Sequence, residues 1–256
     1  MSGAYTHRPV LLEEAIQGLA IRPDGAYVDG TLGRGGHSEA IARGLTAGDR
    51  LLCIDRDSQA LEEGRARLAP WAGQITFLHG NFGDLAALLD GAGVERVDGM
   101  LFDLGVSSPQ LDDPARGFSY QVDAPLDMRM DQGETLTAWT VVNQWPRQEL
   151  RRVLAQYGEE RYAAAIAAAI ERARAAGPIE TTGALVEIIR GALPAAALRE
   201  KQHPAKRSFQ GIRIAVNDEL TAISRMLQAA IPRLKTGGRL AVISFHSLED
   251  RIIKSE

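Results

Sequence analysis

Residues 29–37 read Asp29-Gly30-Thr31-Leu32-Gly33-Arg34-Gly35-Gly36-His37, directly after the short apolar run Ala26-Tyr27-Val28. Glycine lets the backbone turn sharply and come close to a ligand that a side chain would push away. A strand that runs into such a turn is typical of the nucleotide-binding loop of an α/β fold. The pattern therefore predicts a cofactor site after the first strand.

A second acidic residue belongs to the same predicted site. Asp55 ends the apolar run Leu51-Leu52-Cys53-Ile54, at the distance from the glycine turn where α/β folds bind a ribose. Asp29 would repel the pyrophosphate of a dinucleotide, but it suits a cationic ligand such as S-adenosylmethionine. We therefore interpret the turn and Asp55 as the cofactor site of a methyltransferase.

Apolar runs alternate with helical patterns through the first hundred residues, which indicates parallel strands joined by helices. The expected strands are 26–29, 50–55, 74–78, 97–103 and, after a turn at Gly237-Gly238, 239–245. Helices are expected at 38–44 and 58–68, the second with Ser58 as its N-cap. These elements predict a doubly wound α/β sheet with a ligand crevice at the carboxyl ends of its strands. Asp29, Asp55 and Asp103 would share that rim, unless they are only solvated turn formers.

From about residue 109 to 204 no convincing strand pattern occurs, and the composition favours helices. The expected helices are 147–157, 159–176 and 182–193, and one amphipathic helix then covers 209–234. We expect a sheet core formed by residues 1–108 and 209–256, and a helical insertion at 109–208.

The composition excludes several classes of protein. The formal net charge of -4 argues against a broadly basic nucleic-acid binder, so any RNA contact must come from a local patch. Cys53 is the single cysteine, which excludes an intrachain disulfide and favours a reducing compartment, most simply the cytoplasm. No segment offers the roughly 18 uninterrupted apolar residues of a membrane span, so we expect no membrane partner. Five scattered histidines predict no metal site.

Three further motifs point to one bacterial family. They are Phe102-Asp103-Leu104-Gly105-Val106-Ser107-Ser108, Pro125-Leu126-Asp127-Met128-Arg129-Met130-Asp131 and Ile243-Ser244-Phe245-His246-Ser247-Leu248-Glu249. With the glycine turn, they closely resemble the ribosomal RNA small-subunit methyltransferase H (MraW-type) family. The likeness runs from Tyr5 to about Lys254, and its motifs are far more specific than a glycine turn alone.

The resemblance implies a class I methyltransferase with a Rossmann-like sheet. It implies that S-adenosyl-L-methionine is used to methylate the exocyclic amino nitrogen of a cytidine in the decoding region of small-subunit ribosomal RNA. The RNA would be the partner within an assembled or assembling small subunit, and a homodimer stays open. Class I enzymes usually carry two strands after the fifth, whereas the given sequence stops at Glu256, soon after the fifth expected strand. We therefore expect these two C-terminal strands to be absent, and the chain to be less stable and less active than a version that has them.

Matched residue by residue, the family's cofactor contacts fall on Gly35, Gly36, His37, Asp55, Phe82, Asp103 and Gln110. Asp55 could accept hydrogen bonds from both ribose hydroxyls, and Phe82 could lie against the adenine. Phe82 could equally be a core aromatic, and His37 only a helix-start residue.

Asp103 is the first choice to accept hydrogen bonds from the target amino group, with Ser107, Ser108 and backbone carbonyls as helpers. No general base is assigned. The Asp-Leu-Gly-Val-Ser-Ser motif lacks the stacking aromatic of the Asp/Asn-Pro-Pro-aromatic motif found in many amino-directed methyltransferases. Phe118, Tyr120 or an aromatic near His246 would have to replace it.

The best candidates for RNA contact lie where the insertion rejoins the core. They are Lys201, Lys206 and Arg207, with Arg213 downstream and Arg129 within the insertion. The alternative is a solvated loop, because clustered charge is usually surface.

Two other functions stay open at this point. One is a nicotinamide-dependent oxidoreductase on a similar sheet, against which Asp29 and the irregular glycine spacing speak. The other is a non-catalytic cofactor-binding or RNA-binding protein in ribosome assembly.

Overall fold

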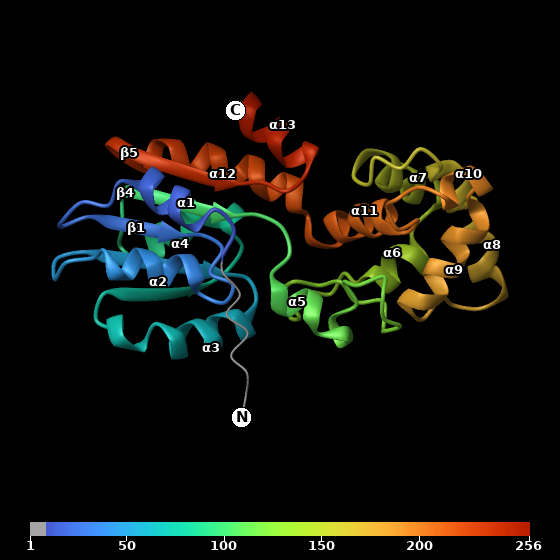
Figure 1. The fold of residues 1–256 in the computed structure, drawn as a ribbon, viewed down its shortest axis with the longest axis horizontal. Coiled ribbons are helices and arrows are strands. Elements are labelled where there is room, and N and C mark those ends of the chain that lie inside the picture. Colours follow the sequence, from blue (N-terminus) through green and yellow to red (C-terminus); the bar gives the residue numbers. More distant parts are fainter. Residues whose placement is uncertain (1–8) are drawn as a thin grey trace. The chain divides into compact units, whose positions relative to one another are not determined.

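Two compact units make up the chain, which we describe from a computed structural model covering residues 9–256 (Figure 1). Unit 1 takes in the chain up to Gly105 and again from Leu220 to Glu256. Unit 2 is the intervening segment Val106–Glu219. Each unit has its own hydrophobic core.

Unit 1 is built on a five-stranded sheet in the order β3-β2-β1-β4-β5, with every neighbouring pair parallel (Figure 1). The strands are β1 (Ala26–Asp29), β2 (Arg50–Asp55), β3 (Ile75–His79), β4 (Val97–Asp103) and β5 (Leu234–Ile243). This confirms the predicted parallel α/β sheet. No strand follows β5 in the described residues up to Glu256.

Helices cover the two faces of this sheet, so the inner strands are apolar on both sides. Tyr27, Leu51 and Leu101 face a core that includes residues of α1, α2 and α3. Val28, Leu52 and Phe102 face the opposite core, with residues of α4 and α12. The helices are α1 (Leu12–Leu19), α2 (Gly36–Arg43), α3 (Ser58–Arg67), α4 (Leu85–Gly91), α12 (Glu219–Arg233) and α13 (Ser247–Ser255).

The turn after β1 requires a glycine at position 30. A Cβ atom there would lie 2.0 Å from Cε1 of Phe102, a fully buried residue of β4. The Gly30 N–H donates to the Leu101 carbonyl at 2.8 Å, which holds the turn against β4. The glycine therefore allows the loop that begins the predicted cofactor site to leave the sheet at this point.

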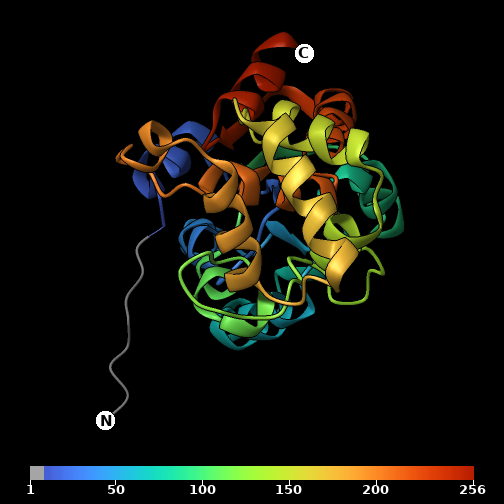
Figure 2. The same ribbon diagram turned by 90° about the vertical axis from the view of Figure 1, so that its right-hand side faces the viewer.

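Unit 2 is helical, as expected, and Figure 2 turns its yellow and orange helices toward the viewer. Its core includes Leu150, Ile166, Leu185 and Phe209 from four different helices. Besides its helices, unit 2 has an isolated antiparallel β-bridge between Pro125 and Thr181. The helices are α5 (Ser108–Asp112), α6 (Ala138–Gln144), α7 (Arg147–Gln156), α8 (Ala163–Ala176), α9 (Thr182–Ala192), α10 (Ala195–Leu198) and α11 (Lys206–Asn217).

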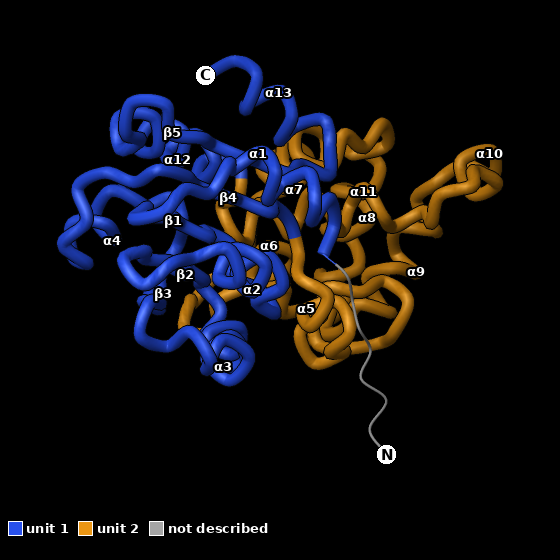
Figure 3. Tube along the Cα trace, turned by 60° about the vertical axis from the view of Figure 1, so that its left-hand side comes forward, with its two compact units in different colours: residues 1–105, 220–256 blue, residues 106–219 orange. Residues whose placement is uncertain are grey.

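The prediction of a single helix at 209–234 is wrong, because the structure has two helices there. Asp218 has the left-handed conformation, with φ of 49°, and ends α11 before α12 begins. α11 packs against α6 and α7, so it belongs to unit 2 (Figure 3). The units therefore meet in sequence at residues 105/106 and 219/220, and not at the expected boundaries 108/109 and 208/209.

Several local expectations also differ from the structure. β3 covers 75–79 and not 74–78, β5 ends at 243 and not at 245, and α8 begins at 163 and not at 159. Ser58 is the first residue of α3, and the N-cap is Asp57, whose carboxylate accepts the Gln59 N–H at 3.1 Å. β5 begins at Leu234, because Gly237 lies in a bulge and does not end the strand; the register with β4 shifts there. A left-handed glycine inside a strand is a recognised device for such a bulge.

Gly30→Ala should lower the free energy of unfolding by about 1–3 kcal/mol, because the added methyl group overpacks the contact with Phe102. Gly18→Ala is the matched control, since nothing lies within 4 Å of the added Cβ inside α1. There the same change should stabilise the protein by about 0.5–1 kcal/mol. Urea denaturation of both variants measures the contrast, and equal effects would contradict the role given to Gly30.

Candidate functional site

The loops after β1, β2 and β4 are hydrogen-bonded to one another at the carboxyl edge of the sheet. The Leu32 N–H donates to the Ile54 carbonyl at 3.0 Å, which joins the first loop to β2. The Asp103 N–H donates to Oγ1 of Thr31 at 2.6 Å, which joins it to β4. Asp29, Asp55 and Asp103 end three adjacent strands, so the structure places all three on one edge, as the sequence predicts.

Asp55 is anchored by one backbone N–H on each carboxylate oxygen. Oδ2 accepts from Gly33 at 2.8 Å and Oδ1 accepts from Asp57 at 2.9 Å. Each oxygen keeps a second lone pair, so the carboxylate can still accept two hydroxyl groups. Burial raises the pKa of Asp55 to about 6, against the lowering effect of the two backbone bonds. The side chain is therefore mostly ionised at neutral pH.

The N-terminus of α2 follows the glycine turn directly. Gly35 has a φ of 73°, a left-handed conformation that glycine adopts without strain, and it is the N-cap of the helix. The first amides of a helix have no acceptor within the helix and carry a partial positive charge. Gly36 and His37 thus present backbone donors that suit an anionic group such as a carboxylate.

Asp29 is completely buried and has an internal role. Its carboxylate accepts the Ser38 hydroxyl at 2.6 Å and the Thr31 N–H at 3.1 Å. Burial raises its pKa despite these bonds. With no exposed surface, the Asp29 side chain cannot contact a ligand directly, so any preference for a cationic cofactor would act through its charge alone.

His37 is also buried, and its ring lies between the end of β4 and the segment that precedes α1. Nδ1 lies 3.7 Å from Oδ2 of Asp103, and Nε2 lies 3.1 Å from the Val10 carbonyl. The Asp103 side chain, in contrast, is 26% exposed. The imidazole is therefore placed to orient Asp103, and contact of His37 with a ligand would have to use its backbone.

Phe82 opens a short 3-10 turn, Phe82–Asp84, just after β3. Its ring meets Phe102 edge to face, with centroids 5.9 Å apart, and packs against the core. The core interpretation thus explains part of its environment. The ring is only partly buried, which leaves surface for a base.

Ser107, Ser108 and Gln110 belong to unit 2, where they start α5. Oε1 of Gln110 accepts the Ser107 N–H at 3.1 Å in a capping box, and Gln110 is buried. Their observed contacts are explained by this local role.

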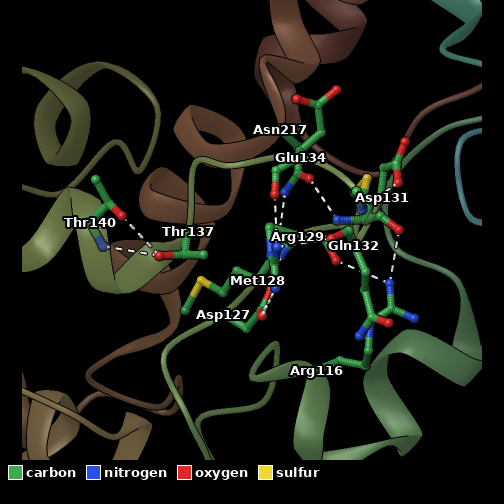
Figure 4. A network of polar contacts seen from close by, with 12 residues as sticks. Arg116, Asp127, Met128, Arg129, Asp131, Gln132, Glu134, Thr137, Thr140 and Asn217 are labelled. Carbon is green, nitrogen blue, oxygen red and sulfur yellow. Dashed lines mark hydrogen bonds and ion pairs between the residues drawn. The ribbon is translucent and has the colours of Figure 1, made fainter.

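Two of the five predicted RNA contacts are engaged inside unit 2. Arg129 forms a bidentate pair with Asp127, at 2.9 and 2.7 Å, and donates to the carbonyls of Gln132 and Glu134 (Figure 4). Pairing with Asp127 raises the pKa of Arg129 above its usual range. Arg213 holds Glu219 in the same bidentate way, with both distances 2.8 Å. Both guanidinium groups therefore organise the fold of unit 2.

The other three lie at the start of α11 and in the segment before it. Lys201 and Lys206 are exposed, and Arg207 is partly buried beside a small cavity of about 30 Å³. His203, between them, stacks on Tyr120 with ring centroids 4.5 Å apart. Burial lowers the pKa of His203, and the charge of Arg190 lowers it further, so this ring adds no charge to the surface near neutral pH.

Sequence reasoning missed the side chains that support the edge. Thr31 and Ser38 bind the ends of β4 and β1, and Glu249 caps α13. A capping-box pattern from His246 to Glu249 was the one available signal. An open cleft of about 490 Å³ lies at the opposite edge, lined by Arg50, Arg96 and Lys235 among others, and contains no predicted site residue.

Within residues 9–256, no three His, Cys, Asp or Glu side chains are grouped so that they could hold a metal ion. No helix in this part of the chain is long and apolar enough to cross a membrane.

Comparison with known proteins identifies the family. A family model described as the MraW methylase family matches residues 4–256. Ribosomal RNA small subunit methyltransferase H of Paenibacillus sp. (strain JDR-2) is 55% identical and aligns with 98% of this chain and 81% of its own length. The protein of the same name from Symbiobacterium thermophilum is 54% identical and aligns with 98% of this chain and 79% of its own length. A solved SAM-dependent O-methyltransferase from Thermotoga maritima is 13% identical, with a TM-score of 0.33 over 40% of this chain and 38% of its own. On the family match and the two relatives, this chain belongs to the MraW methylase family.

Proposed function

We propose that this protein transfers a methyl group from S-adenosyl-L-methionine to the exocyclic amino nitrogen of a cytidine in small-subunit ribosomal RNA. The observation that carries the cofactor half is Asp55, fixed by two backbone amides beside a glycine turn with two acceptor positions left. The RNA half is supported by the two relatives, both of which are named for that substrate. Membership of a methylase family argues against the oxidoreductase alternative.

The residues of the carboxyl edge suit the parts of this cofactor. Asp55 would accept both ribose hydroxyls, and the amides of Gly36 and His37 would hold the carboxylate. Gly35, whose own N–H donates to the Leu32 carbonyl at 2.7 Å, would contribute by letting the turn come close to the cofactor. Phe82 would lie against the adenine with the surface that Phe102 leaves uncovered. Gln110 remains a proposed contact from unit 2. When bound, the cofactor supplies an electrophilic methyl group on a sulfonium.

Asp103 is the proposed acceptor for the target amino group. A cytosine amino nitrogen is a poor nucleophile because its lone pair is delocalised into the ring, and it gains positive charge as it is methylated. A carboxylate that accepts its hydrogen bonds stabilises that charge. Thr31 fixes the Asp103 backbone and His37 faces the carboxylate, so the acceptor is held in place before the base arrives. Ser107 and Ser108 remain secondary candidates.

The basic segment before and within α11 is the proposed grip on the RNA backbone. A base enters a catalytic site only after it leaves its stack, so the flanking phosphates must be held. Lys201, Lys206 and Arg207 offer side chains for this contact. Arg129 and Arg213 would support it indirectly, through the fold of unit 2. We propose an assembled or assembling small subunit as the substrate, and the cytoplasm as the place of action.

Asp55→Asn should weaken S-adenosylmethionine binding at least tenfold at pH 7.5, because a neutral amide cannot replace a charged acceptor for two hydroxyls. Asp98→Asn is the matched control, since Asp98 is a partly buried acid near the opposite end of β4. Its loss should leave cofactor affinity unchanged. Isothermal calorimetry decides between them.

The wild-type protein should also lose cofactor affinity as the pH falls from 7.5 to 5. The hydroxyls bind the ionised carboxylate, whose pKa is about 6, so protonation below that value competes with the ligand. The Asp55→Asn variant should show a flat profile over the same range. A parallel decline in both proteins would assign the pH effect to another group.

Asp103→Asn should lower kcat at saturating S-adenosylmethionine at least tenfold, because the charged acceptor acts in the transition state. Methyl transfer to small ribosomal subunits, with cofactor affinity measured separately, isolates this effect. Full turnover at saturation would limit Asp103 to cofactor binding.

Replacing Lys206 and Arg207 together by Glu should weaken RNA binding and flatten its salt dependence, since fewer counterions are released. The control reverses two exposed arginines of α7 and α8, Arg151 and Arg172, with the same change of net charge. Binding titrations at several salt concentrations compare the two. The same loss in both variants would show that only net charge matters.

A further inference from the structure

The target cytosine needs an apolar surface as well as a polar acceptor. A base that has left its stack is usually held between aromatic or apolar side chains. The loop after β4 reads Leu104-Gly105-Val106 and offers no aromatic residue of its own. An aromatic platform would therefore have to come from another element.

Phe118 and Tyr120 are already used within unit 2. Phe118 is 6% exposed, and the guanidinium of Arg116 lies over its ring, 5.9 Å from the centroid. Tyr120 stacks on His203 and meets Phe209 edge to face, at 5.7 Å. Phe118 is therefore almost fully covered, and Tyr120 already stacks on another ring.

Phe245 differs from both because its side chain is 56% exposed. It comes two residues after Ile243, which pairs with Asp103 across β4 and β5. The Leu104 N–H donates to the Ile243 carbonyl at 3.0 Å, so the two chains are still joined where the strands end. Phe245 therefore lies at the same edge of the sheet as the proposed acceptor, in the loop that follows the adjacent strand.

The ring of Phe245 lies beside a backbone without a side chain. A Cβ atom built on Gly105 would be 3.5 Å from Cδ2 of the ring, which is ordinary contact distance. Gly105 has a φ of 94°, a conformation that residues with side chains rarely adopt. Gly105 therefore puts no side chain into the space next to the Phe245 ring.

The backbone that carries Phe245 is held by a buried carboxylate. Oε2 of Glu249 accepts the N–H groups of Phe245, at 2.8 Å, and of His246, at 3.2 Å. Glu249 is 1% exposed, and it forms a capping box with His246 at the start of α13. Although its burial opposes ionisation, bonds from the His246 ring and the two amides hold the pKa of Glu249 below its usual range. The backbone at Phe245 is therefore fixed while its ring is exposed. A backbone that is already ordered loses less conformational entropy when a flat ligand binds to the ring.

We propose that Phe245 is the platform on which the target cytosine stacks, next to the acceptor Asp103. This rests on the proposed function, since it names the residue that holds the base of that same reaction. The carboxylate ends β4 and the ring follows the end of β5 by two residues, so the ends of two neighbouring strands would supply the polar and the apolar contact. Phe245 acts by positioning the base.

The test compares Phe245→Ala, Phe245→Leu and Phe245→Trp in methyl transfer from labelled S-adenosylmethionine to small ribosomal subunits. The alanine variant should lose at least tenfold in kcat/KM, about 1.4 kcal/mol, because stacking on the base is lost. The leucine variant, apolar but without an aromatic face, should lose most of the same factor. The tryptophan variant should stay within about threefold of wild type, since any aromatic face can stack on a base.

Ile231→Ala is the matched control. Ile231 is also 56% exposed, but it lies near the end of α12, just before β5 begins at the opposite edge of the sheet. Its removal should leave kcat/KM unchanged. Cofactor affinity, measured by calorimetry, should be unchanged in all four variants, and thermal melts should show that each is folded.

Full activity of Phe245→Ala, or full recovery by leucine, would overturn the stacking assignment and leave the proposed function intact. A loss of cofactor affinity that accounts for the whole loss of kcat/KM would also overturn it, by placing the ring on the donor side. A wild-type protein that transfers no methyl group to the subunit would instead refute the proposed function, and this assignment with it.

Discussion

The backbone after β1 continues to hydrogen-bond to both neighbouring strands once β1 has ended, and the site depends on this constraint. The Gly30 N–H reaches the Leu101 carbonyl of β4, and the Leu32 N–H reaches the Ile54 carbonyl of β2. The first contact requires that residue 30 has no side chain, because Phe102 fills the space. With the loop fixed on both sides, the Gly33 amide meets the carboxylate of Asp55. One loop thus determines the relative positions of residues from three strands.

Much of the sheet could be predicted from the sequence because its inner strands are buried on both faces. Such strands appear as unbroken apolar runs, and an acid ends each of β1, β2 and β4, so their limits were predicted correctly. The break between α11 and α12 could not be predicted in this way. The apolar periodicity continues through Asp218, and neither glycine nor proline marks the left-handed residue. Gly237-Gly238 was predicted to be a turn before the fifth strand, but it forms a bulge inside β5. Glycine is used in both kinds of structure, so the sequence does not distinguish them.

The site was predictable in position but only partly in detail. Parallel strands bring their carboxyl ends to one edge, so the acids at those ends were expected there. Whether such an acid faces the solvent or the interior depends on partners remote in sequence. Ser38 draws Asp29 inward, and no pattern of residues announces that bond. For the same reason the sequence does not reveal that Arg213 is paired with Glu219, which lies beyond the helix break, at the start of α12. The contacts with cofactor and RNA remain predictions.

The interrupted course of unit 1 along the chain also sets an order of assembly. Unit 2 is continuous in sequence, whereas β4 and β5 pair only after the whole of Val106–Glu219 has been synthesised. During translation the helical unit can fold while the sheet still has four strands and β4 has an open edge. The last strand closes that edge and at the same time brings His246 and Glu249 to the rim. The pairing of β5 with β4 therefore completes the sheet and the proposed site together, after the helical unit has been synthesised.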